Sequence, residues 1–186
     1  AGKGMIQATV GKSLSFEQFA TLYQETGRPI SWTALLSSAG AGLGIGGALE
    51  QLRRSDELIA AGNKVYPQVT CRALTFEMQM KAPFLFESYP GFKKISQADL
   101  EGKKKIYASA EFREEFREMI KGGGMARGWP KATLTYCPSD PSLEERRLNE
   151  IAAERGVDPV DLSFDLSLEN NLEARFRMPA ANANED

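Results

Sequence analysis

The chain has 186 residues, with 25 acidic and 23 basic side chains, a formal net charge of −2 and no histidine. This length suits one domain of ordinary size or part of a larger one. Without histidine, Ser-His-Asp and Cys-His catalytic sets and histidine-based zinc sites are excluded within this polypeptide, and the near-balanced charge predicts no nucleic-acid partner.

The first seventy residues predict alternating strands and helices. Short β-branched and apolar runs predict strands at 5–10, 30–36 and 65–71, and apolar residues at helical spacing predict helices at 16–26 and 48–61. Ser13 or Ser15 is the expected N-cap of the first helix, which Gly27 ends. Because each crossover is long, we expect the strands to be parallel, as in an α/β domain.

The pattern changes between residues 72 and 128, which are rich in aromatic residues and interrupted by Pro83, Pro90 and Gly91. We interpret this region as an insertion that contains one clear helix, at 110–121 with Ser109 as its N-cap. Two interpretations of the insertion stay open. It is either a lid over the mouth of a site at the strand ends, or a satellite hydrophobic cluster without a role in binding.

The remaining residues predict a strand at 132–136, a helix at 148–155 ended by Gly156, a helix that begins at Pro159 with Asp158 as its N-cap, and a last strand at 174–178. Cys71 and Cys137 lie far apart in the sequence, which suits a reducing compartment and a cytoplasmic location. Cys71 is interpreted as a buried structural residue rather than a nucleophile. No apolar stretch has the length of a membrane helix, so we expect no membrane association.

Four residues along the third predicted strand are the candidate substrate-binding residues: Tyr66, Gln68, Thr70 and Arg72. Ligands of parallel α/β sheets gather at the carboxyl ends of the strands, and alternate residues of a strand share a face. Arg72 is the expected partner of a substrate carboxylate. No residue is assigned a catalytic or metal-binding role.

Two other functions stay open. A nucleotide- or dinucleotide-binding α/β module would use the loop from Gly42 to Gly47, with Gly42, Gly44 and Gly47 near the phosphates. Five residues separate this loop from the strand before it, and no acidic residue ends the next strand, which counts against the fingerprint. A non-catalytic assembly domain would instead use Phe84 and Phe86 to contact a partner.

Several segments together resemble the N-acyl-D-amino-acid deacylase (D-aminoacylase) branch of the amidohydrolase superfamily. The most specific is IAAERGVDPVDLSFDLSLE at 151–169, which is similar to the family pattern E-I-A-x-E-R-G-x-D-P-x-D-x-L-x-D-L when Glu150 is included. GRPISWTALL, KVYPQVTCRALTFEM with its Tyr66-Pro67 pair, PFLFES and RFRMPAANANED add to the likeness. Tyr66 matches a family residue near the substrate.

The resemblance implies an α/β fold, a partial TIM-type (β/α) barrel with an aromatic-rich insertion. Residues 1–72 would be βα units of the barrel, 73–130 the insertion or lid, and 131–186 further βα units of the same incomplete domain. The implied activity is metal-dependent hydrolysis of the amide bond of N-acyl-D-amino acids or related N-acyl compounds, so a small-molecule N-acyl amino acid is the expected partner.

Zinc is the implied cofactor of the parent enzyme, with none bound by residues of this chain, because Trp32 stands where better-known members carry a metal-binding histidine. The family's H-x-H strand would precede Ala1, and its metal-binding aspartate would follow Asp186. By resemblance, we therefore expect an internal fragment that lacks the rest of the barrel and is inactive on its own.

Overall fold

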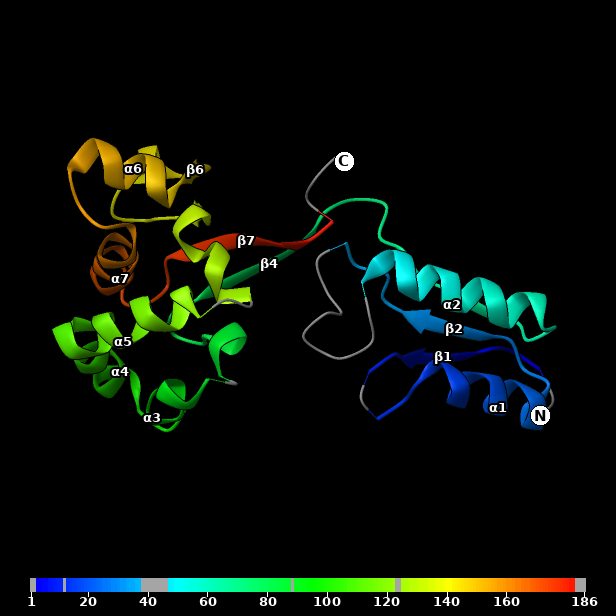
Figure 1. The fold of residues 1–186 in the computed structure, drawn as a ribbon. Helices are drawn as coiled ribbons and strands as arrows, with labels where there is room; N and C mark the ends of the chain where they lie inside the picture. The colour runs from blue at the N-terminus through cyan, green and yellow to red at the C-terminus, as the bar shows by residue number, and fades with distance from the viewer. Residues whose placement is uncertain (1–2, 12, 38–46, 88, 123–124, 183–186) are drawn as a thin grey trace. The chain divides into compact units, whose positions relative to one another are not determined.

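The computed structural model describes residues 3–11, 13–37, 47–87, 89–122 and 125–182. The chain forms two compact units, one of residues 1–74 with 181–186 and one of residues 75–180 (Figure 1).

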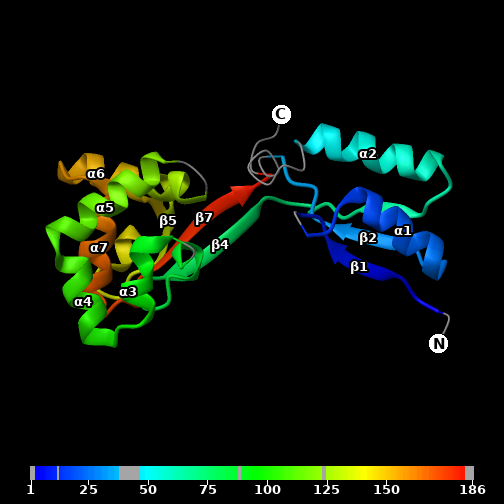
Figure 2. The same cartoon turned by 60° about the horizontal axis from the view of Figure 1, so that its bottom comes forward.

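The first unit is a three-stranded parallel sheet with two crossover helices. Its elements are β1 (Ile6–Thr9), α1 (Phe16–Thr26), β2 (Ile30–Thr33), α2 (Ala48–Ala60) and β3 (Val65–Pro67). The strand order is β1-β2-β3, and both pairs are parallel, as the sequence predicts. β2 and β3 are shorter than expected, although backbone bonds from Gln68 to Trp32 and from Leu35 to Gln68 extend their pairing slightly. Figure 2 shows the sheet and its helices from a second side.

The ends of α1 follow from local sequence. Ser15 and Gln18 form a capping box, in which each side chain accepts a hydrogen bond from the other residue's backbone N–H. Gly27 ends the helix in the left-handed conformation, with φ of 63°, and donates its N–H to the carbonyl of Tyr23. Of the two predicted N-caps, Ser15 is confirmed.

Trp32 joins the sheet of the first unit to both helices. Its ring is fully buried and meets the Phe16 ring of α1 edge-on at a centroid distance of 5.2 Å. Its Nε1–H donates to Ser55 Oγ of α2 at 3.2 Å, and Ser55 Oγ donates to the carbonyl of Val65 in β3 at 2.9 Å. One serine hydroxyl therefore ties β2, α2 and β3 together.

The second unit has a mixed architecture, with its own sheet of β4 (Leu74–Gln79), β5 (Thr133–Tyr136), β6 (Arg146–Arg147) and β7 (Arg175–Ala181). The order is β4-β7-β5-β6, and β5 pairs antiparallel with both β6 and β7. The prediction that residues 131–186 form further βα units is therefore wrong. The connection from β5 to β6 contains only the single 3₁₀ turn at Pro141–Leu143, which is too short for a parallel crossover.

Helices cover the second sheet: α3 (Lys93–Ser96), α4 (Leu100–Ala108), α5 (Ala110–Lys121), α6 (Leu148–Arg155) and α7 (Pro159–Glu169), with 3₁₀ segments at Phe84–Phe86, Pro90–Phe92 and Met125–Lys131. The predicted N-caps Ser109 and Asp158 accept backbone hydrogen bonds from α5 and α7. The sequence did not predict β4 or α4. In α4, three consecutive lysines obscure the helical spacing of the apolar residues.

The aromatic residues of 73–130 form the main core of the second unit rather than a satellite cluster. The rings of Phe86, Phe116 and Trp129 pack together, and they also meet Phe164 of α7 and Phe176 of β7. This single core includes residues on both sides of 130, so the structure places no domain boundary there. The lid role of the insertion stays a prediction.

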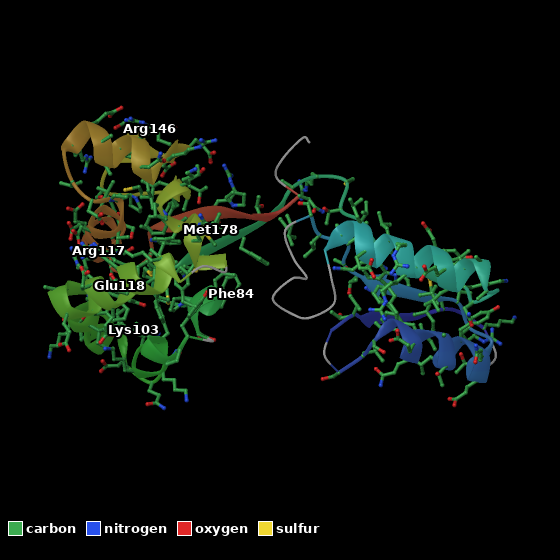
Figure 3. All side chains as sticks on the ribbon, in the orientation of Figure 1. Phe84, Lys103, Arg117, Glu118, Arg146 and Met178 are labelled. Atoms are coloured by element: carbon green, nitrogen blue, oxygen red, sulfur yellow. The ribbon has the colours of Figure 1, made fainter. Side chains whose placement is uncertain are left out.

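Two arginines of α5 link this helix to α7. Arg113 donates to the carbonyl of Tyr107 at 2.9 Å and to Asp165 at 2.6 Å, and Arg117 donates to Asp161 at 2.5 Å. Arg117 is labelled on α5 in Figure 3. The Arg113 side chain is only 14% exposed, so this network is better shielded from water than an ordinary surface ion pair.

Among the described helices, none has both the length and the apolar composition to span a membrane.

We predict that Ser55→Ala destabilises the first unit by about 1–3 kcal/mol, because the buried Trp32 N–H loses its acceptor and the Val65 carbonyl loses a donor. Urea unfolding followed through the Trp32 indole N–H resonance measures the loss. Ser13→Ala, at an exposed serine of the same unit, is the matched control and should change little. Equal stability of the two variants would contradict the proposed tie.

We also predict a pH dependence from Tyr107, whose hydroxyl donates to the carbonyl of Met80 at 2.9 Å. Burial raises the pKa of this hydroxyl. Above pH about 10 the unfolded tyrosine ionises while the folded one stays protonated, so its contribution to stability is lost as the pH rises. In urea unfolding between pH 8 and 11, Tyr107→Phe should flatten this decline. Tyr66→Phe, at an exposed tyrosine, is the matched control.

Candidate functional site

One face of the β1–β2–β3 sheet carries polar side chains, and the other carries the helices. Trp32 touches both α1 and α2, so both helices pack on the face to which its ring points. Side chains alternate between faces along a strand, so Ser31 and Thr33 point to the opposite face. The register sets Gln7 and Tyr66 beside Ser31, and Thr9 beside Thr33. We call these residues, together with Gln68, the polar face.

A chain of hydrogen bonds crosses the three strands on the polar face. Gln68 Nε2 donates to Ser31 Oγ at 2.7 Å, and Gln7 Nε2 donates to Gln68 Oε1 at 3.4 Å. Ser31 is 5% exposed although it points away from the face on which α1 and α2 pack, because the Gln68 side chain lies against it. Nearer the carboxyl ends, the Thr9 and Thr33 hydroxyls are 3.1 Å apart.

The polar face can both donate and accept further hydrogen bonds. A glutamine amide has two hydrogens on nitrogen and two lone pairs on oxygen. Within the described residues, Gln68 uses one hydrogen toward Ser31 and one lone pair toward Gln7, which leaves one of each. Gln7 keeps its side-chain oxygen and one hydrogen. This combination suits an amide ligand, whose carbonyl oxygen needs a donor and whose N–H needs an acceptor.

The four predicted site residues lie in different surroundings. Tyr66 is 43% exposed beside Ser31, and Gln68 is part of the hydrogen-bond chain, so the structure brings these two together. Thr70 is half-buried, and its hydroxyl accepts a bond from Asn182 at 3.0 Å. Arg72 is exposed, and its side chain makes no hydrogen bond or ion pair within the described part of the chain.

Five residues of this region are not among the predicted site residues: Gln7, Thr9, Ser31, Thr33 and Asn182. The alternation of IQAT in β1, with exposed Gln7 and Thr9 between half-buried Ile6 and Ala8, is a signal that could have found Gln7. Ser31 lies in a strand whose burial does not alternate, and Asn182 is distant in sequence, so neither had a comparable signal.

Trp32 marks the position to which the resemblance assigns a metal-binding histidine. Because its side chain lies between Phe16 and Ser55, residue 32 faces the helices and not the polar face. The polar face offers amide and hydroxyl groups, whereas zinc sites in proteins are built from thiolates, imidazoles and carboxylates. In the described part of the chain, no three acidic or cysteine side chains gather as metal ligands. The residues of the polar face therefore do not fit a zinc ion.

Two other predictions concern residues outside the polar face. Cys71 is exposed, which corrects its interpretation as a buried residue: β3 ends at Pro67, so Cys71 lies beyond the sheet. Phe86 is fully buried while Phe84 is 49% exposed, so the two cannot form one assembly surface. Gly42 and Gly44 lie outside the described residues, and Gly47 is the N-cap of α2.

Comparisons with known proteins give a distant likeness. No protein-family model matches the chain, and no curated protein matches it. Solved structures of D-aminoacylase do match, among them one described as defining a novel subset of amidohydrolases and one concerned with its binuclear metal center, at TM-scores of 0.33 and 0.32. Each is 15% identical, and the match covers 89% of this chain but 24% of that one. The chain thus spans about a quarter of those proteins, and the scores are too low to assign fold or activity.

Proposed function

We propose that this chain is the substrate-binding part of an amidohydrolase that cleaves the amide bond of N-acyl-D-amino acids or related N-acyl compounds. The observation that carries the proposal is the donor and acceptor capacity that Gln7 and Gln68 keep on the polar face among the described residues. The resemblance of the segment at 151–169, which spans most of α6 and α7, to the deacylase family adds the reaction class.

The chemistry that these residues supply is binding and orientation. A free Gln68 N–H would donate to the substrate carbonyl, and the Gln7 oxygen would accept from the substrate N–H. Arg72 is exposed and free to pair with the substrate carboxylate in a bidentate manner. The polar face contains no carboxylate, thiol or imidazole. Activation of the attacking water is therefore assigned to groups outside the polar face.

The first test is hydrolysis of N-acetyl-D-amino acids by the protein that carries this chain, followed through release of the free D-amino acid. Gln68→Leu keeps a similar side-chain size but removes the amide, so we expect the KM to rise about tenfold for the loss of one hydrogen bond in the site. Gln97→Leu is the matched control, because Gln97 is an exposed glutamine of the second unit. Absence of both hydrolysis and binding in the wild-type protein would overturn the proposal.

The second test separates recognition of the carboxylate from recognition of the amide. The wild-type protein should prefer an N-acyl-D-amino acid over its neutral carboxamide analogue, and Arg72→Met should remove most of this preference, at least about tenfold. Arg72→Lys keeps the charge but not the bidentate geometry, so it should retain part of the preference. Arg127→Met, at an exposed arginine of the second unit, is the control. An unchanged ratio in Arg72→Met would remove Arg72 from the site.

A further inference from the structure

Asn182 is the residue directly after β7, and it joins the segment after β2 to the segment after β3. Its Oδ1 accepts a hydrogen bond from the Ser37 N–H at 2.7 Å, and its own N–H donates to Ser37 Oγ at 3.1 Å. Its Nδ2 donates to the carbonyl of Leu35 at 3.3 Å and to Thr70 Oγ1 at 3.0 Å. The segment after β2 and the segment after β3 are thus bound to the same side chain.

Both the side chain and the backbone of Asn182 suit this place. The two hydrogens of the amide nitrogen have one partner each, and the amide oxygen has a third. An aspartate would keep the oxygen but would lose both donors. The φ of 53° lies in the left-handed region, which asparagine enters more readily than other residues with a side chain. Glycine fits this φ but supplies no side-chain bond.

The two segments bound to Asn182 are connected to Gln68, a residue of the polar face. Leu35 is 9% exposed, and its N–H donates to the carbonyl of Gln68 at 3.0 Å, while the Gln68 N–H donates to the carbonyl of Trp32 at 2.8 Å. Thr70 lies two residues beyond Gln68. The backbone of Gln68, which carries the side-chain amide, is therefore held by the hydrogen bond from Leu35 and by Thr70 further along the chain. Both Leu35 and Thr70 are bound to Asn182.

We infer that Asn182 is a positioning residue, which fixes the segments after β2 and β3 and so holds the Gln68 amide in its place on the polar face. The consequence for substrate binding rests on the function proposed above, but the anchoring itself does not. Asn182 acts through Leu35 and Thr70 and makes no hydrogen bond of its own with Ser31 or Gln7 within the described residues. Its loss should therefore weaken ligand binding without changing the groups that the polar face presents.

The test compares Asn182→Gly and Asn182→Asp with the wild-type protein by amide hydrogen exchange in the native state. Asn182→Gly keeps the left-handed backbone and removes every side-chain bond, so exchange at Ser37 and at the bonded N–H groups of Leu35 and Gln68 should accelerate about tenfold or more. Asn182→Asp keeps an acceptor for the Ser37 N–H, so Ser37 should stay protected while exchange at Leu35 and Gln68 accelerates. The matched control is Asn171→Gly in the second unit, where an exposed asparagine has a φ of 54°.

Unchanged exchange at Ser37, Leu35 and Gln68 in Asn182→Gly would overturn the inference, and so would equal acceleration at these three positions in the Asn171→Gly control. If Asn182→Gly does not fold, acceleration at Leu35 and Gln68 but not at Ser37 in Asn182→Asp supports the inference, and its absence overturns it. In the hydrolysis assay, Asn182→Gly should raise the KM several-fold with little change in kcat. A wild-type protein without activity or ligand binding would refute the proposed function, while the exchange result would still decide the role of Asn182.

Discussion

The first unit depends on the alternation of side chains across three parallel strands. Both crossover helices pack on one face, where Trp32 contacts Phe16 of α1 and Ser55 of α2. The apolar residues of each strand are used for this contact, so the residues between them must point to the other face. The polar face is therefore a direct consequence of burying Trp32, and a change that turns Trp32 outward would remove it.

The hydrogen bonds of the polar face satisfy the buried hydroxyl of Ser31, which points away from α1 and α2. Ser31 is nearly inaccessible, and a buried hydroxyl without a partner is costly. Gln68 supplies that partner and in turn accepts from Gln7, so the strands are joined by side chains as well as by their backbones. Because all of these groups are neutral, they hold one another without the desolvation cost of charges, which makes them better suited to orient a neutral amide than to activate water.

Sequence patterns predicted local structure better than they predicted pairing. Residue type was enough to predict the helix N-caps Ser15, Ser109 and Asp158. Crossover length was enough to predict the parallel β2–β3 pair. The antiparallel β5–β7 pair did not, because a strand followed by two helices and another strand resembles a βα repeat. The role of the aromatic residues of 73–130 in the main core was not predicted either, because their partners, such as Phe164 and Phe176, come much later in the chain.

Only part of the candidate site could be predicted from the sequence, because some of its residues come together only through long-range contacts. Tyr66 and Gln68 could be found because they alternate within one segment, and the face they share is a local property. Asn182 is more than a hundred residues from Thr70 and from Leu35, and only the fold brings it to them. A residue that holds a site in place without touching its ligand carries no motif, since its identity is set by backbone conformation and by carbonyls that any sequence provides. Its role follows from the bonds it makes, and asparagine alone combines two donors, one acceptor and a tolerated left-handed φ at that position.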